Sequence, residues 1–193
     1  MLKLVKIAVT GGIASGKTTV CELFKKAGAY VVSADAIAHE LLDPETDLGR
    51  QIIRALGSDI LQNGKINRQV VAEKVFKDPK ALRELEQILH PVILTRIEQT
   101  YFEACQSNYK AFVVEIPLLY EIGAEGFYDV VIAVESDEKI AKQRFGRDYE
   151  RRMKRHLDPK IKSAKAHYTI KNNGTLDDLR KEVEKLQQRV IHP

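Results

Sequence analysis

The sequence predicts an α/β protein, a doubly wound parallel sheet with helices on both faces. Short apolar runs alternate with longer stretches whose apolar residues recur at helical spacing, and this alternation is typical of parallel sheets. A glycine-rich loop follows the first apolar run, and one long block lacks a convincing strand. We therefore expect the 193 residues to form one domain in which insertions extend a single sheet.

The expected strands are short. The first, Leu4–Val9, has the apolar character of a buried strand and leads into Thr10 and glycines. Four more strands are expected in chain order, at Tyr30–Val32, Phe112–Ile116, Val130–Val134 and Tyr168–Ile170.

Two helices are predicted by apolar stripes of the kind that face a core. One stripe runs from Val20 to Ala27, and Gly28 then provides a C-terminal stop. The final helix has five apolar residues in register, at Leu176, Leu179, Val183, Leu186 and Val190.

A helical insertion is expected from about residue 36 to 104. Within it, Asp78 followed by Pro79 is a strong start signal for a helix. The apolar stripe of that helix reaches Leu89, where His90 and Pro91 are expected to interrupt it.

The charge is unevenly distributed. Residues 139–165 contain eleven Lys or Arg and three acids, so this segment has a net charge of +8, whereas the whole chain has +4. A basic segment on an otherwise acidic protein is expected to meet an anionic ligand.

Composition indicates an ordinary globular protein, with 44% hydrophobic and 30% charged residues. The two cysteines, Cys21 and Cys105, lack metal-ligand spacing, which favours small buried residues in a reducing compartment. Neither a signal peptide nor an apolar run long enough to span a membrane is found, so we expect a cytoplasmic protein without a membrane partner.

The strongest motif is GGIASGKT at residues 11–18, which satisfies G-x-x-x-x-G-K-[ST] between a strand and a helix. In this P-loop the backbone N–H groups and the helix N-terminus bind phosphates, Lys17 reaches the terminal phosphates of ATP, and the Thr18 hydroxyl ligates Mg²⁺. The expected nucleotide-binding residues are Gly12, Ile13, Ala14, Ser15, Gly16, Lys17, Thr18 and Thr19.

The rest of the chain favours a small-molecule kinase over other P-loop proteins. The N-K-x-D and D-x-x-G motifs of GTPases do not occur. An insertion to hold the acceptor and a basic lid at 139–165 fit a small kinase. A nucleic-acid-binding ATPase is the alternative from another class, but only Phe145 and Tyr149 accompany the basic residues.

Further motifs resemble the dephospho-coenzyme A kinase family nearly end to end. They are TGGIASGKT at 10–18, ADAIA at 34–38, GKINR at 64–68, VF at 75–76, LHP at 89–91, IPLLYE at 116–121, QRFGRD at 143–148 and IKNNG at 170–174. The resemblance implies a sheet of P-loop kinase type with a helical coenzyme A region and a lid. It also implies transfer of the γ-phosphoryl group of ATP to the ribose 3′-hydroxyl of dephospho-coenzyme A. The alternative is another small-molecule kinase, such as one that phosphorylates a nucleoside or a nucleotide.

Two acids are expected at the carboxyl edge of the sheet, where ligands bind in such folds. Asp35 follows the second strand and is the candidate base, supported by the resemblance, although it would also suit a helix cap. Glu115 ends the third strand and would hold Mg²⁺ through a water, or would simply face solvent.

Arg144 and Arg147 are three residues apart on an expected helix, so both can neutralise charge on the transferring phosphate. For each of them a solvated surface is the alternative. By resemblance, Arg152 is a later lid arginine and Asn172 lies near the adenine.

The expected acceptor-binding residues depend on the resemblance. Pro117, Leu118 and Leu119 would form a pocket wall, and Glu121 would orient polar groups or have no specific role. By resemblance, His90 would bind the coenzyme A substrate and Arg68 would meet the phosphates of the acceptor. The alternatives are a hydrogen-bonded structural histidine for His90 and a surface salt bridge for Arg68.

This chain departs from the family pattern at four places. Ser33 replaces a frequent Asp, the lid is shorter between Asp148 and Arg152, His156 replaces Gln, and His167 replaces Asp. The change at Ser33 leaves Asp35 as the one acid of an Asp-x-Asp pair, and a single base is enough for kinase chemistry. The other changes concern lid and adenine contacts, and all four leave the phosphate site intact.

Overall fold

The computed structural model describes residues 3–146, 149–153 and 156–191. The chain forms two compact units, which are described separately below. The sheet unit comprises Met1–Ser33 and Tyr101–Pro193, and the helical unit comprises Ala34–Thr100.

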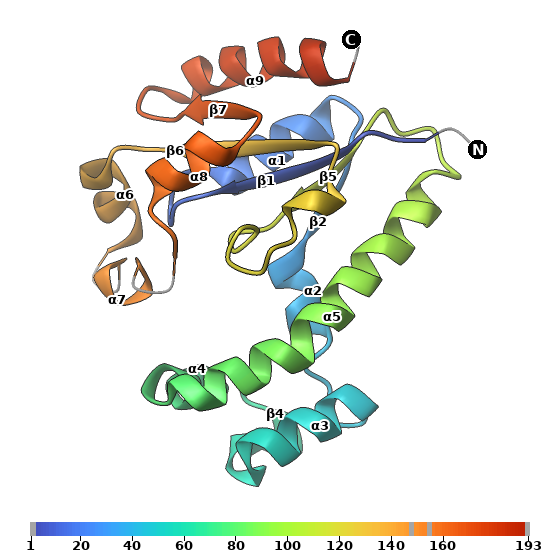
Figure 1. Cartoon of the computed structure of the whole chain (residues 1–193), viewed down its shortest axis with the longest axis vertical. Coiled ribbons are helices and arrows are strands. Elements are labelled where there is room, and N and C mark those ends of the chain that lie inside the picture. Colours follow the sequence, from blue (N-terminus) through green and yellow to red (C-terminus); the bar gives the residue numbers. More distant parts are fainter. Residues whose placement is uncertain (1–2, 147–148, 154–155, 192–193) are drawn as a thin grey trace. The chain divides into compact units, whose positions relative to one another are not determined.

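The sheet unit is built on five parallel strands (Figure 1). Their spatial order is β2-β5-β1-β6-β7, so β1 lies in the centre between β5 and β6. The strands are β1 (Lys6–Gly11), β2 (Tyr30–Ser33), β5 (Phe112–Glu115), β6 (Val130–Glu135) and β7 (Tyr168–Lys171). All five predicted strands are confirmed, and β1 begins and ends two residues later than predicted.

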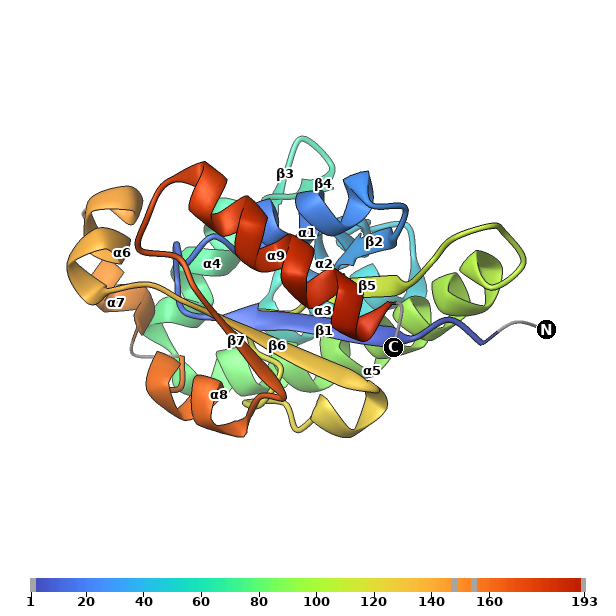
Figure 2. The same ribbon diagram turned by 90° about the horizontal axis from the view of Figure 1, so that it is seen from above.

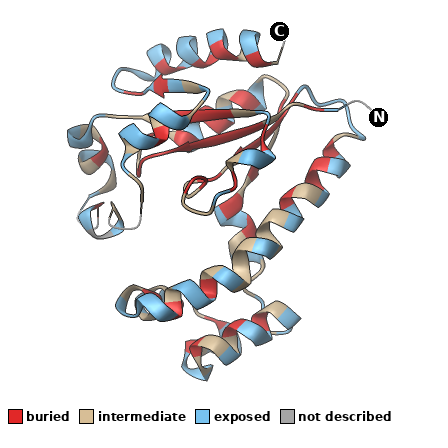
Figure 3. Ribbon diagram, in the orientation of Figure 1, coloured by how far each residue is buried: buried red, intermediate tan, exposed pale blue. Residues whose placement is uncertain are grey.

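Helices cover both faces of this sheet, which confirms the doubly wound fold. Helices α1 (Lys17–Lys26) and α9 (Leu176–Val190) share one apolar core with the strands, built around Phe24, Ile7 and Val183. Helix α8 (Pro159–Lys165) lies on the opposite side of β6 from α1 (Figure 2). The central strands are buried almost throughout (Figure 3).

The ends of these helices follow from local sequence. Gly28, directly after α1, has a φ of 95°, so the predicted glycine stop is confirmed. Helix α9 begins with a capping box, in which Thr175 and Asp178 each bond the other's backbone N–H. The prediction that Leu176 shares the buried stripe of α9 is wrong, because at the first helical position its side chain is 55% exposed.

The helical unit has an apolar core of its own. Helices α2 (Ala34–Glu40), α3 (Asp47–Leu56) and α4 (Arg68–Lys77) precede the long α5 (Pro79–Ala104). Core residues include Ile52, Ile60, Val75 and Leu85. A short 3₁₀ turn (Ser58–Ile60) leads into a hairpin of β3 (Leu61–Gln62) and β4 (Lys65–Ile66).

Two features of this unit were not predicted. Helix α5 is 26 residues long and continues through Pro91, so the predicted interruption at His90 and Pro91 is wrong. A proline removes one backbone donor and bends a helix, but the hydrogen bonds of neighbouring turns can keep it continuous. The hairpin turns at Asn63 and Gly64, which both have positive φ.

The basic segment contains three helices. Helix α6 (Glu138–Phe145) is followed by α7 (Tyr149–Met153), and both precede α8. Lys142 of α6 forms ion pairs with Glu138 at 2.8 Å and Glu150 at 2.5 Å, and these carboxylates raise its pKa. Since α8 packs on the sheet, the predicted lid is narrowed to α6 and α7 among the described residues of the segment.

Candidate active site

The phosphate loop connects β1 to α1 in the sheet unit. Gly16 has a φ of 98°, and a Cβ atom there would lie 2.2 Å from the side-chain nitrogen of Asn172. Only glycine therefore fits at the turn into α1, for conformation and for space. The loop backbone is held in a strand-to-helix turn of the kind that presents N–H groups to an anion.

Lys17 opens α1 and is largely buried. Its ammonium donates a hydrogen bond of 2.8 Å to the carbonyl of Gly12, within the loop itself. The Ser15 hydroxyl is also buried and has no hydrogen-bond partner among the described residues. A buried cation and an orphaned hydroxyl fit a phosphate group, which supplies acceptor oxygens for both.

Thr18 and Glu115 form the candidate magnesium site. The Thr18 hydroxyl donates a hydrogen bond of 2.9 Å to Oε1 of Glu115, at the end of β5. A hydroxyl and a carboxylate are hard oxygen ligands of the kind that Mg²⁺ takes, so this pair fits the ion. Among the described residues there is no cluster of three or more His, Cys, Asp or Glu that could hold a metal ion. The case for a magnesium site therefore depends on Thr18 and Glu115.

Asn172 supports the phosphate loop from the end of β7. Its side-chain amide donates a hydrogen bond of 2.8 Å to the Ser15 carbonyl, and both groups are buried. Arg144, at the end of α6, donates a long hydrogen bond of 3.3 Å to the Asn172 carbonyl. Arg144 and Asn172 therefore lie at the phosphate loop, whereas the predicted Arg147 falls outside the described residues.

The loop after β5 lies beside the phosphate loop. The Thr10 hydroxyl donates a hydrogen bond of 3.3 Å to the carbonyl of Pro117. Leu119 is fully buried in the core, whereas Pro117 and Leu118 are half-buried. Glu121 forms an ion pair of 2.7 Å with Lys162 of α8. Sequence reasoning missed Lys162, because one buried lysine cannot be recognised within a run of basic residues.

Three predicted residues belong to the helical unit. Asp35 is exposed in the first turn of α2, inside the helix rather than at its cap, two residues after β2 ends at Ser33. Arg68 is exposed and donates a hydrogen bond of 3.1 Å to the His39 carbonyl, so the contact seen is not a salt bridge. His90 is half-buried, and this burial lowers its pKa.

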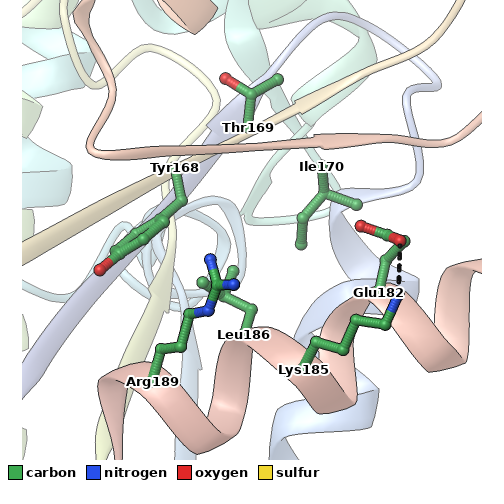
Figure 4. A pocket seen from close by; sticks show the side chains of 7 residues that line it. All are labelled: Tyr168, Thr169, Ile170, Glu182, Lys185, Leu186 and Arg189. Carbon is green, nitrogen blue, oxygen red and sulfur yellow. Dashed lines mark ion pairs between the residues drawn. The ribbon is translucent and has the colours of Figure 1, made fainter. Parts of the chain in front are cut away.

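A separate pocket of about 290 Å³ lies between β7 and α9 (Figure 4). Its lining includes Tyr168, Leu186 and Arg189, together with a Lys185–Glu182 ion pair of 3.5 Å. It contains none of the residues predicted for the active site.

Comparison with known proteins places this geometry in a family. The family model for dephospho-CoA kinase matches residues 5–178. The chain belongs to the dephospho-CoA kinase family. The match includes the phosphate loop, Glu115, Arg144 and Asn172.

Relatives of this family resemble the chain over nearly its whole length. A dephospho-CoA kinase of Chlamydia pneumoniae is 44% identical over 192 residues, covering 95% of each chain. One of Protochlamydia amoebophila is 40% identical over 199 residues, covering 98% of each. The solved dephospho-CoA kinase from Campylobacter jejuni superposes with a TM-score of 0.73 at 31% identity, covering 96% of each. Family membership and the P-loop kinase fold thus agree with the site geometry.

Proposed function

We propose that the protein transfers the γ-phosphoryl group of ATP to the ribose 3′-hydroxyl of dephospho-coenzyme A, in the cytoplasm and with Mg²⁺. The observation that carries this proposal is the family match over residues 5–178, which contains a complete phosphate loop. No helix within residues 3–146, 149–153 and 156–191 has the length and apolar character needed to cross a membrane.

The residues of the phosphate loop hold and orient ATP. Backbone N–H groups from Gly12 to Thr19 and the N-terminus of α1 bind the β- and γ-phosphates. Lys17 exchanges its hydrogen bond to the Gly12 carbonyl for one to a phosphate oxygen. Thr18 and Glu115 would hold Mg²⁺, directly or through water, and the bound ion would supply positive charge beside the phosphates.

The remaining steps concern the acceptor hydroxyl and the lid. Asp35 accepts or orients the proton of the 3′-hydroxyl, a role for which an exposed carboxylate is available at the start of α2. Arg144 and Arg147 approach the transferring phosphoryl group and neutralise its charge. Closure of α6 and α7 excludes water, so that ATP is not hydrolysed instead.

Four residues remain as acceptor contacts, namely Arg68, His90, Pro117 and Leu118. Two others predicted for this role have different partners in the structure. Leu119 is fully buried in the core, and Oε1 of Glu121 is bound to Lys162. Arg68 is exposed, so its guanidinium would be available to an acceptor phosphate once it leaves the His39 carbonyl.

Nucleic acid is not expected as a partner. Three lysines of the basic segment, Lys142, Lys162 and Lys165, already pair with carboxylates of this chain. These pairs reduce the charge left for a phosphate backbone. We expect neither salt-dependent DNA or RNA binding nor nucleic-acid-stimulated hydrolysis of ATP.

The position of the transferred phosphate tests this proposal. Wild-type protein is incubated with ATP, Mg²⁺ and dephospho-coenzyme A, and the product is examined by ³¹P NMR and mass spectrometry. We expect one added phosphate, on the ribose 3′-oxygen. Adenosine and cytidine serve as comparison acceptors, and faster transfer to either would favour the nucleoside kinase alternative.

A further inference from the structure

A buried ion pair connects α8 to the loop after β5. The ammonium of Lys162 is fully buried and lies 2.7 Å from Oε1 of Glu121. It also donates a hydrogen bond of 2.6 Å to the Pro117 carbonyl. The same Glu121 oxygen accepts a hydrogen bond of 2.8 Å from the backbone N–H of Leu157, just before α8. Glu121 therefore holds two points of the chain that follows α7.

This pair lies close to the phosphate loop. The Pro117 carbonyl that Lys162 binds also accepts the Thr10 hydroxyl, at the end of β1. A Cβ atom at Gly12 would lie 3.0 Å from Cγ of Pro159, the first residue of α8, so α8 begins directly against the loop. A shift of α8 or of the loop after β5 would therefore also displace the phosphate loop.

Stability alone does not account for such a pair. Burying an ammonium and a carboxylate is costly, and well-packed apolar side chains of similar size are often as stable or more so. Burial lowers the pKa of Lys162, and the bond to Glu121 acts in the opposite direction. The second oxygen of Glu121, Oε2, is buried without a hydrogen-bond partner among the described residues. We therefore explain the buried pair by the positions that it fixes, namely those of α8, Leu157 and the loop after β5, rather than by a gain in stability.

We propose that Glu121 and Lys162 are a positioning pair that fixes the C-terminal end of the α6–α7 segment against the phosphate loop. This inference rests on the proposed function for the role of α6 and α7 as a lid. The pair does not touch ATP or the acceptor. It sets where the lid segment ends, and hence how well the lid covers bound nucleotide.

The test uses the double variant Lys162→Met/Glu121→Gln, which removes both charges and so leaves no buried ion unpaired. Lys165→Met is the matched control, because Lys165 lies on the same helix and pairs with Glu125 at 3.4 Å but is half-exposed. Four quantities are measured for each protein: the melting temperature, the Kd for Mg·ADP, the KM values for ATP and dephospho-coenzyme A, and the ratio of ADP released without acceptor to ADP released with it.

A folded double variant is expected to bind Mg·ADP roughly tenfold more weakly. Its KM for ATP should rise by a similar factor, and a larger share of its ADP should arise without acceptor, because a misplaced lid admits water. The KM for dephospho-coenzyme A should stay unchanged, and Lys165→Met should match wild type in all four quantities. If the double variant does not fold, Lys162→Gln/Glu121→Gln replaces it, since glutamine at position 162 keeps a donor for the Pro117 carbonyl and again no buried charge is left unpaired.

Two outcomes would overturn this inference. A folded variant with wild-type nucleotide affinity and wild-type ADP ratio would reduce the pair to a packing role. A change confined to the KM for dephospho-coenzyme A would make Glu121 an acceptor contact. Failure of the proposed function is recognised separately, because wild type would then not phosphorylate dephospho-coenzyme A, whereas the affinity for Mg·ADP would still test the pair.

Discussion

The hydroxyl of Thr18 lies 2.9 Å from Oε1 of Glu115, although 97 positions separate the two residues in the chain. The parallel pairing of β1 with β5 explains this proximity, because it sets Val9 level with Glu115 at the edge where β1 enters the phosphate loop. A hydroxyl and a carboxylate are thereby placed where the phosphates of ATP are expected to bind.

Replacing Glu115 by Gln should weaken magnesium binding. The amide keeps the size of the side chain but loses the charge that a hard divalent cation requires. We expect the Mg²⁺ concentration for half-maximal activity to rise about tenfold, with a lower kcat at saturation. The measurement is a Mg²⁺ titration of ADP release, with Glu22→Gln, an exposed acid on α1, as the control. A titration curve identical to wild type would remove Glu115 from the metal site.

Gly16→Ala should disrupt the phosphate loop. Alanine at this position would have to keep the left-handed backbone conformation of Gly16, at a cost of about 1–2 kcal/mol. Its Cβ atom would also lie 2.2 Å from the side-chain nitrogen of Asn172. The control is Gly64→Ala, which has a φ of 73° but nothing within 4 Å of the added atom. We expect both variants to lower the free energy of unfolding, measured in urea, with the larger loss in Gly16→Ala. Only Gly16→Ala should lose affinity for Mg·ADP. Equal losses of Mg·ADP affinity in the two variants would contradict the proposal that Asn172 supports the phosphate loop.

Asp35→Asn should slow phosphoryl transfer and leave ATP binding intact. An amide cannot accept the proton of the acceptor hydroxyl, and removal of a general base costs roughly 10²–10⁴ in rate. The comparison is with Glu40→Gln, an exposed acid at the end of the same helix. Steady-state kinetics should show kcat falling and the KM for ATP unchanged. If Asp35→Asn keeps full activity, the base lies elsewhere.

The capping box of α9 should make stability depend on acid. The hydroxyl and the backbone N–H of Thr175 both donate to Asp178, and these bonds lower the pKa of that carboxyl below its ordinary value of 3.8. A carboxylate with a lowered pKa contributes stability that is fully present above 3.8 and is lost as the pH falls through its folded-state pKa.

The difference in unfolding free energy between wild type and Asp178→Ala should therefore be constant from about pH 8 to pH 5 and should shrink below about pH 4. Urea titrations at several pH values measure it, and Glu184→Gln, an exposed acid later in α9, controls for general charge effects. A difference that stays constant down to pH 3 would show that the cap acts without its charge.

The sheet unit could be predicted well, because its strands and phosphate loop depend on local sequence signals. Features that depend on contacts between distant residues, or on very short elements, were missed. The phosphate loop and the five strands depend on short apolar runs and glycines, which sequence shows directly. The β3–β4 hairpin was missed because its strands have two residues each, although Asn63-Gly64 is a recognised hairpin signal. The path of α5 through Pro91 was missed because an internal proline removes one backbone donor and bends a helix without necessarily ending it.

The candidate site shows the same division. Lys17, Thr18 and Glu115 were assigned from motif and strand position, and the structure brings Thr18 and Glu115 together. Lys162 could not be assigned, because its burial depends on the packing of α8 against β6, and Glu121 gave no sign of its partner. A role for a charged residue within a charged segment becomes visible only when its environment is known.

Acceptor dependence tests the central claim most directly. ADP release by the wild-type protein is measured with ATP and Mg²⁺, first alone and then with dephospho-coenzyme A. We predict little release without the acceptor and turnover on the order of 1–100 s⁻¹ with it, as is usual for kinases. Equal release in the two conditions would contradict the account, because the protein would then be an ATPase that happens to share the fold.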